Sequence, residues 1–170
     1  GQPKMNDKEP MKIKAEDLPP SFIRIDRDGT WHYKGNEMFR KDIVKLFYEN
    51  LKRDETGRYY IALENDLASL EVEDTAYVVR AVYRSGTPGE GNERIAVLLN
   101  DETQEEIDCG TLCINKDNVL YCSVKPGRHP ARFLRPSYYQ IAETFDYDES
   151  RDSYFLCLNG TRYYIRNRDG

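Results

Sequence analysis

Residues 39–63 read FRKDIVKLFYENLKRDETGRYYIAL, and residues 134–158 read LRPSYYQIAETFDYDESRDSYFLCL. In both stretches a predicted helix is followed by an acidic turn and then by a Tyr-rich hairpin. The matched positions share residue type as well as order, with one gap inside the acidic turn. An aromatic strand precedes each stretch, at 31–33 and at 120–122. We interpret the pattern as an internal duplication rather than a chance likeness of two strand–helix–hairpin units.

The helix expected in the first repeat spans residues 37–52. Its apolar residues recur at i, i+4, i+7, i+8 and i+12, which is the spacing of one helical face. Asn36 is a suitable N-cap for it. In the second repeat, Ser137 and Gln140 have the spacing of a capping box, which predicts a helix over 137–145.

Each repeat needs a cover for the apolar face of its sheet, since such a face is stable only when it is buried. The sequence therefore predicts an α+β fold of two similar small lobes, each an antiparallel sheet packed by one helix. We expect a polar N-terminal tail over residues 1–20, an N-terminal lobe over 21–75 and a C-terminal lobe over 76–170. A cleft between two lobes is a common place for a ligand.

The composition excludes several classes of protein. The chain has 170 residues, of which 25 are basic and 30 acidic, so its net charge is −5. An acidic chain is a poor nucleic-acid binder, because neutralisation of phosphates dominates that affinity. No apolar run is long enough for a membrane helix, and the polar N-terminus lacks the apolar core of a signal peptide. Four cysteines without an export signal favour reduced thiols, so we expect a cytoplasmic protein.

The negative charge is concentrated in one segment. Residues 85–118 contain two basic and eight acidic residues, whereas residues 119–170 contain eight basic and six acidic ones. No acid occurs between Val119 and Ala142, a segment with five basic side chains: Lys125, Arg128, His129, Arg132 and Arg135. The last two arginines directly precede the second helix, and a helix N-terminus attracts anions. Either a protein carboxylate or a bound anion should compensate their charge.

Arg40 occupies the equivalent place in the first repeat. Together these features define seven candidate ligand-binding residues: His32, Arg40, Glu64, Glu73, Asp74, Arg132 and Arg135. The two arginines of the second repeat would hold an anionic group, and Arg40 and His32 would assist from the other lobe. The three acids would orient the arginines or accept hydrogen bonds from a base or a sugar.

Motifs for catalysis and for metals are weak. The chain has only two histidines, His32 and His129, and no nucleophile elbow of the Gly-x-Ser-x-Gly type. Cys109, Cys113 and Cys122 have a tolerable spacing for zinc, but the Cys-x2-Cys pairing is absent. Cysteine often behaves as a small buried apolar residue. We therefore expect core thiols, no metal, no cofactor and no catalytic residue.

Two groups of residues resemble a bacterial family catalogued as domain-of-unknown-function family 1285. The first group comprises Gly29 to Gly35 (GTWHYKG), Phe39-Arg40, Asp54, Gly57, Tyr59, Glu64 and Val72-Glu73-Asp74. The second comprises Ala131-Arg132-Phe133, Arg135 and Tyr139. The resemblance extends over roughly residues 22–165 and is more specific in the first half.

This resemblance implies a duplicated two-lobe fold with a C-terminal lobe similar to pleckstrin-homology domains. It also implies a nucleotide-like ligand in the interdomain cleft and a role in signal transduction, with no enzymatic activity established. We predict a non-catalytic ligand-binding or sensor protein for a small anionic ligand, and leave its oligomeric state open. Two alternatives remain: a metal-dependent hydrolase or phosphotransfer enzyme using His32 with Glu73 or Asp74, and a protein-interaction module.

Overall fold

The computed structural model describes residues 12–169, which divide into two compact units. The N-terminal unit contains residues 12–25 and 31–73, and the C-terminal unit contains residues 26–30 and 74–169. The short turn at 26–30 therefore belongs to the second unit by its contacts. Each unit is described by itself below.

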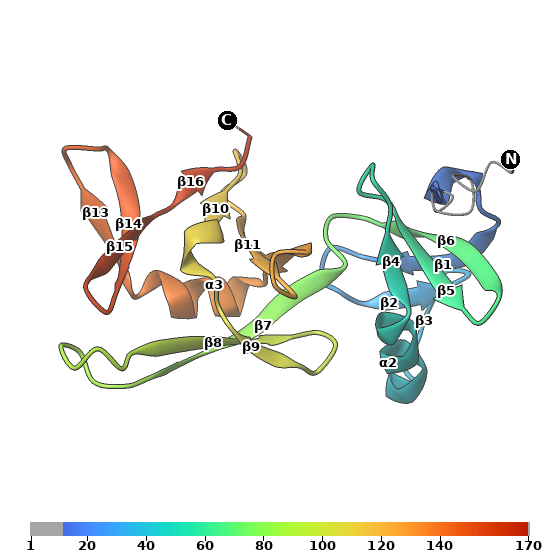
Figure 1. Ribbon diagram of the computed structural model, residues 1–170, viewed down its shortest axis with the longest axis horizontal. Helices are drawn as coiled ribbons and strands as arrows, with labels where there is room; N and C mark the ends of the chain where they lie inside the picture. The colour runs from blue at the N-terminus through green and yellow to red at the C-terminus, as the bar shows by residue number, and fades with distance from the viewer. Residues whose placement is uncertain (1–11, 170) are drawn as a thin grey trace, which may run out of the picture. The chain divides into compact units, whose positions relative to one another are not determined.

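Six strands form one sheet in the N-terminal unit, in the order β3-β2-β1-β6-β5-β4 (Figure 1). Its elements are η1 (Ala15–Asp17, a 3-10 helix), β1 (Pro20–Ile25), β2 (Trp31–Tyr33), β3 (Asn36–Glu37), α2 (Lys41–Glu49), β4 (Leu51–Arg53), β5 (Tyr59–Leu63) and β6 (Asp66–Val72). Neighbouring strands are antiparallel except β1 and β6. One face of this sheet carries the apolar core of the unit.

The helix α2 is shorter than the helix expected over 37–52. Residues on both sides of it pair with the sheet, as β3 and β4, so their backbone groups are satisfied there rather than in helical turns. Asn36 is consequently not the N-cap. Arg40 takes that position, without a side-chain cap. Only Tyr48 of α2 is buried, and Figure 1 shows the helix extending away from the sheet.

Residues 12–20, expected as part of a tail, pack against the N-terminal unit. Ala15 is buried, and its N–H donates to Oδ2 of Asp54 over 2.8 Å. Pro20 already begins β1. The rest of the expected tail, residues 1–11, lies outside the described residues.

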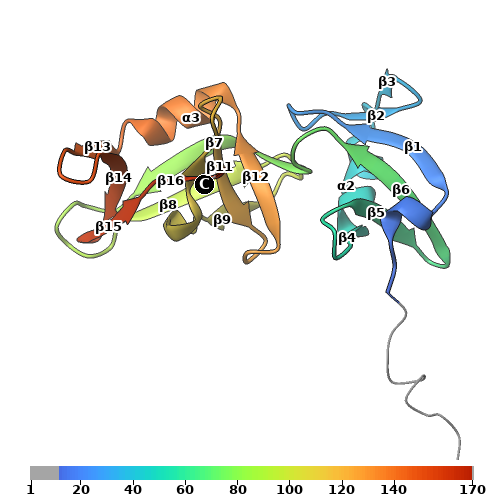
Figure 2. The same cartoon turned by 90° about the horizontal axis from the view of Figure 1, so that it is seen from above.

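The C-terminal unit contains a seven-stranded sheet, in the order β16-β10-β11-β12-β7-β8-β9, and a three-stranded sheet, β13-β14-β15. Its elements are β7 (Tyr77–Ser85), β8 (Arg94–Leu99), β9 (Gln104–Glu106), η2 (Cys109–Thr111), β10 (Cys113–Ile114), β11 (Leu120–Val124), β12 (His129–Phe133), α3 (Arg135–Ala142), β13 (Phe145–Asp148), β14 (Ser153–Leu158), β15 (Thr161–Tyr164) and β16 (Arg166–Asn167). The helix α3 lies over β7 and β12 (Figure 2).

The capping box expected at Ser137 is wrong. Helix α3 begins two residues earlier, at Arg135, with Leu134 as its N-cap and a proline in its first turn. Proline suits that place because its missing N–H would have no helical partner there. Ser137 is fully buried instead, with its hydroxyl 2.6 Å from the carbonyl oxygen of Val79.

The predicted repeat is confirmed in the order of the elements. A helix followed by three antiparallel strands occurs as α2-β4-β5-β6 and again as α3-β13-β14-β15. The acidic turns also match in detail. Oδ1 of Asp54 accepts the N–H and the hydroxyl of Thr56 (2.9 and 2.6 Å), and Oδ1 of Asp148 accepts those of Ser150 (3.0 and 2.6 Å).

The α+β class with two units is likewise confirmed, but the main sheets are not purely antiparallel. The pairs β1–β6, β7–β12 and β10–β16 are parallel. Parallel neighbours need a long connection, and the segments between these strands provide it. The sequence also predicted one sheet in each lobe, whereas the C-terminal unit has a second sheet of three strands.

Candidate functional site

The seven predicted site residues lie in separate places within the two units. Four belong to the N-terminal unit and three to the C-terminal unit: His32, Arg40, Glu64 and Glu73 in the first, and Asp74, Arg132 and Arg135 in the second. We first describe what each group contacts. The cavity of the N-terminal unit follows.

His32 and Glu73 are brought together through Arg24. In the register of the sheet, His32 lies opposite Arg24 on one side and Glu37 on the other, so the three side chains share a row on one face. The guanidinium of Arg24 forms an ion pair with Glu73. The sequence analysis missed Arg24, although the hairpin of β1 and β2 places it opposite His32.

Two other predicted residues are remote from these groups. Glu64 is exposed in the turn between β5 and β6, with φ +52°. Arg135 is exposed at the first position of α3. Among the described residues, no hydrogen bond or ion pair joins either side chain to another predicted site residue.

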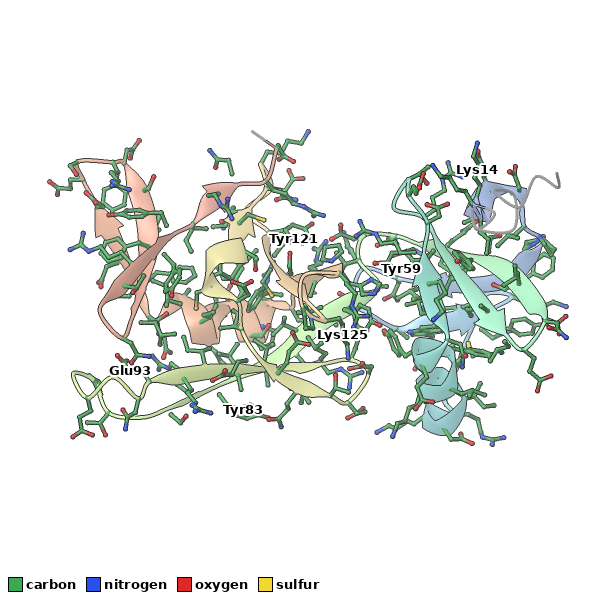
Figure 3. The ribbon with its side chains drawn as sticks, in the orientation of Figure 1. Lys14, Tyr59, Tyr83, Glu93, Tyr121 and Lys125 are labelled. Carbon is green, nitrogen blue, oxygen red and sulfur yellow. The ribbon has the colours of Figure 1, made fainter. Side chains whose placement is uncertain are left out.

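Asp74 is shared by three side chains of the C-terminal unit. Its Oδ2 accepts the hydroxyl of Tyr121 over 2.7 Å and Nη1 of Arg132 over 2.9 Å. Its Oδ1 lies 3.9 Å from Nη1 of Arg168, whose guanidinium is 3.7 Å from the centre of the Tyr121 ring. Burial, together with the hydrogen bond to Asp74, raises the pKa of Tyr121 to about 12. Figure 3 labels this tyrosine.

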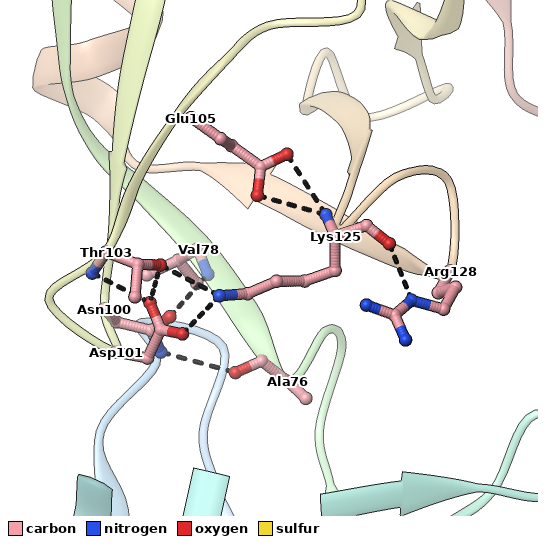
Figure 4. A network of polar contacts seen from close by, with 8 residues as sticks. All are labelled: Ala76, Val78, Asn100, Asp101, Thr103, Glu105, Lys125 and Arg128. Carbon is pink, nitrogen blue, oxygen red and sulfur yellow. Dashed lines mark hydrogen bonds and ion pairs between the residues drawn. The ribbon is translucent and has the colours of Figure 1, made fainter. Parts of the chain in front are cut away.

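The basic segment before α3 is compensated by carboxylates of the same unit. Nζ of Lys125 contacts Oδ2 of Asp101 at 2.5 Å and the hydroxyl of Thr103 at 2.9 Å (Figure 4). The backbone N–H of Lys125 donates to Glu105, and Nε of Arg128 donates to the Lys125 carbonyl. Of the two arginines for which the sequence allowed a carboxylate or a bound anion, Arg132 is paired with Asp74. Among residues 12–169, no ion pair compensates Arg135.

Catalytic and metal chemistry find little support in the described part of the chain. Within residues 12–169 no group of three or more His, Cys, Asp or Glu is placed to hold a metal ion. Burial raises the pKa of Cys109 to about 11 and that of Cys122 further, which keeps both as thiols. The expectation of core thiols does not hold for the fourth cysteine, Cys157, which is exposed on β14.

The N-terminal unit contains an open apolar groove of about 610 Å³. Fourteen residues line it, most of them apolar: Ser21, Ile23, Tyr33, Asn36, Glu37, Met38, Phe39, Arg40, Ile43, Phe47, Ile61, Leu63, Asp66 and Ala68. Pockets of 300–1,000 Å³ with mainly apolar walls and few polar groups are typical of small-molecule sites. The groove is therefore the strongest candidate site in the described residues.

The floor of the groove is one face of the sheet. Ile23 lies opposite Tyr33 across β1 and β2, and Ile61 lies opposite Ala68 across β5 and β6. Residues in direct register share a face, so these pairs form an apolar strip across four neighbouring strands, β2-β1-β6-β5. At about 4.8 Å per strand, the strip is roughly 14 Å wide.

The wall of the groove is the apolar side of α2 and the residues before it. The second half of α2 packs on the sheet, where Trp31 contacts Phe47 and Tyr48 with ring centres 6.0 and 4.8 Å apart. The first half is less covered. Ile43 is only half-buried, and Phe39, just before the helix, is 79% exposed. Within the described residues 12–169, a largely exposed apolar helix face thus stands beside an apolar sheet face.

Arg40 is the predicted site residue that lines the groove. Its guanidinium forms an ion pair with Asp42 at 2.7 Å, and both side chains are exposed. The adjacent segment of β1 is strained, since Phe22 has φ +63° between the lining residues Ser21 and Ile23. A bulky residue in the left-handed region is an outlier of the kind that clusters at ligand sites.

Fold and groove define a two-unit α+β protein with a cavity in its N-terminal unit. Residues 12–75 match the family described as domain of unknown function (DUF1285), N-terminal domain. The expected resemblance to this family is confirmed over these residues of the N-terminal unit. No curated protein matches the sequence.

Two crystal structures of DUF1285 family proteins share the fold. The protein from Silicibacter pomeroyi DSS-3 has a TM-score of 0.71 and 20% sequence identity, over 95% of this chain and 91% of that chain. The protein from Shewanella baltica OS155 has a TM-score of 0.59 and 19% identity, over 74% of this chain and 94% of that chain. These likenesses establish the fold and leave the ligand open. Separately, no helix among the described residues is long and apolar enough to cross a membrane.

Proposed function

We propose that this protein is a non-catalytic ligand-binding protein, and that the groove of its N-terminal unit takes up a small molecule with an apolar body. The observation that carries the proposal is the groove of about 610 Å³ between the sheet and α2. A sensor role, expected from the family resemblance, would depend on such uptake. The nucleotide-like character of the ligand stays a prediction of that resemblance.

The exposed apolar surface of the groove supports a ligand rather than a packing defect. Phe39 and Tyr33 are 79% and 46% exposed, and both line the groove. Exposed apolar area costs free energy that a ligand would recover at about 25 cal/mol per Å² buried. Isolated exposed apolar residues are common on protein surfaces, but a contiguous concave group of them marks a binding site.

Binding of neutral n-alkanols to the full chain tests the proposal. Trp31 is the single tryptophan, and its ring packs on the groove residue Phe47, so its fluorescence reports on the groove. We expect octanol and decanol to change this fluorescence with saturation. Each methylene buried contributes about 0.8 kcal/mol, which is roughly a fourfold gain in affinity.

Two matched variants of apolar residues locate the site. Phe39→Ser removes an exposed side chain that lines the groove, and we expect it to weaken decanol binding by roughly tenfold. Leu46→Ser removes an exposed side chain of α2 outside the groove and should leave the affinity unchanged. Equal losses in both variants, or an affinity independent of chain length, would contradict the proposal.

A further inference from the structure

A lysine held by aromatic rings lies beside the groove. Lys34 occupies the turn between β2 and β3, with lining residues on both sides, Tyr33 before it and Asn36 after it. Its Nζ lies 5.4 Å from the centre of the Tyr33 ring and 5.6 Å from that of Phe22. The backbone N–H of Lys34 donates to the carbonyl of Phe22 over 2.9 Å, which fixes the turn against β1.

This ammonium group keeps its charge available. In residues 12–169, no carboxylate lies within ion-pair distance of Lys34. The rings attract the cation but leave its three N–H donors open to another group. Arg40 lies toward the other end of the β2–β3 hairpin, since Met38 is already hydrogen-bonded to Trp31. Its guanidinium donates two hydrogen bonds to Asp42, from Nε over 3.1 Å and from Nη2 over 2.7 Å, so Lys34 is the cation with open donors beside the groove.

Two acids line the groove, and neither faces this cation. Glu37 lies in register with His32, so its side chain belongs to the sheet face opposite to that of Tyr33. Asp66 is on β6, two strands from the strand of Tyr33, which is about 10 Å across the sheet. The groove therefore has a cation beside it at the β2–β3 turn and an acidic residue on the far side of the sheet strip.

We infer that the natural ligand of the groove is a single-chain amphiphile with an anionic head, and that Lys34 binds this head. The inference rests on the proposed function for its site and adds the chemical class of the ligand. The apolar chain would lie along the strip of the sheet, under α2. The head would receive hydrogen bonds from the Lys34 ammonium at the end of the groove next to Tyr33. Such charge-assisted hydrogen bonds are stronger than neutral ones.

The backbone of β1 at Phe22 supports this assignment. Phe22 has φ +63°, and left-handed backbone at a bulky residue persists only where surrounding interactions hold it. Lys34 and Gly35, with φ +49° and +83°, form the two-residue turn between β2 and β3, as such a turn requires. The Phe22 ring and the Tyr33 ring thus lie on either side of the Lys34 ammonium group.

The test compares three probes with the same chain at pH 8: decanoate, decanol and decylamine, each below its micelle concentration. Both charged probes are ionised at this pH. We expect the full chain to bind decanoate at least tenfold more tightly than decylamine. In Lys34→Gln the affinity for decanoate should fall about three- to tenfold, while the affinity for decanol stays unchanged.

Two control variants separate charge from shape. Lys34→Arg retains the cation and should retain decanoate affinity, and Lys52→Gln removes an exposed lysine of β4 outside the groove and should have no effect. If the protein binds decanol but Lys34→Gln leaves the affinity for decanoate unchanged, the inference is overturned. The proposed function would still stand. Decylamine as the tightest probe would also overturn the inference. Failure of all three probes would overturn the proposed function itself.

Discussion

Gly29 and Gly35 have the same backbone conformation but differ in how closely other atoms surround them. Both have left-handed backbone, with φ +82° and +83°. A Cβ atom on Gly29 would lie 2.5 Å from Nδ2 of Asn100 and 2.6 Å from Cγ2 of Val78, whereas nothing lies within 4 Å of the same atom on Gly35. The Gly29 carbonyl also accepts a hydrogen bond from Asn100 over 3.1 Å.

Replacing each glycine by alanine should therefore give different losses of stability. We expect Gly35→Ala to cost about 1 kcal/mol, the price of left-handed backbone for a residue with a Cβ. Gly29→Ala should cost about 2–4 kcal/mol, because a clash in a buried site is added. Urea unfolding of both variants measures the difference, and equal losses would show that the contact with Asn100 and Val78 is not tight.

The repeated acidic turns make two carboxylates unusually acidic. Hydrogen bonds from the Thr56 side chain, and next from backbone N–H groups, lower the pKa of Asp54 to about 2. Hydrogen bonds from the Ser150 and Tyr164 side chains lower the pKa of Asp148 to about 2 in the same way. The same turn chemistry in both repeats has thus produced the same shift.

Acid should weaken the fold through these carboxylates. Their pKa in the unfolded chain is about 3.9, above the folded value, so the stability they contribute is complete above about pH 5 and is lost as the pH falls toward 2. We expect Asp54→Asn to be less stable than the wild type at pH 7 and to approach it near pH 2. Urea midpoints at pH 7, 4 and 2.5 test this. A constant difference at all three values, or the same convergence in Glu55→Gln, would contradict it.

At the scale of elements, the β14–β15 turn is tied to the β7–β8 loop by one asparagine. Oδ1 of Asn159 accepts the N–H of Glu93 over 2.8 Å, and its Nδ2 donates to the Glu93 carbonyl over 3.0 Å. Asn159 and Gly160 both have positive φ, as a two-residue hairpin turn of type I′ requires. The Asn-Gly pair thus makes the turn and also fixes the neighbouring loop.

The variant Asn159→Gly keeps the turn, because glycine adopts positive φ without strain, and removes the two side-chain hydrogen bonds to the Glu93 backbone. The N–H of residue 159 can still donate to the Glu93 carboxylate, 3.3 Å away. We expect the Glu93 amide to exchange its hydrogen roughly three- to tenfold faster, as the loss of a hydrogen bond of about 1 kcal/mol predicts. Asn92→Ala is the control, since Asn92 accepts the N–H of Thr87 in the same loop. Unchanged exchange at Glu93 would show that the link does not order the loop.

The spacing of residues along the chain predicted where the two helices lie better than it predicted the residues at which they begin and end. The apolar spacing over 37–52 correctly indicated the amphipathic face of α2. Its limits were wrong because β3 and β4 pair with strands that lie elsewhere in the sequence. Ser137 failed as a cap for a similar reason, since the carbonyl of Val79, far away in the chain, binds its hydroxyl.

At the scale of the whole molecule, the duplication and the α+β class could be predicted because they depend on order and composition. The site could not. Arg132 and Lys125 attracted attention as a basic segment, but their partners Asp74 and Asp101 lie far away in the sequence. The groove arises from the angle at which α2 leaves its sheet, which no local pattern encodes. Arg40 was found only because the repeat pointed to it.

The most direct test of the groove as the ligand site is an amide and methyl NMR titration of the full chain with decanoate. We expect saturable shifts confined to residues of the groove and to Lys34, with Ile23, Ile43 and Ile61 among the methyl groups that move most. Signals of the C-terminal unit should remain in place. Shifts centred on Arg132 and Tyr121, or spread evenly over both units, would contradict it.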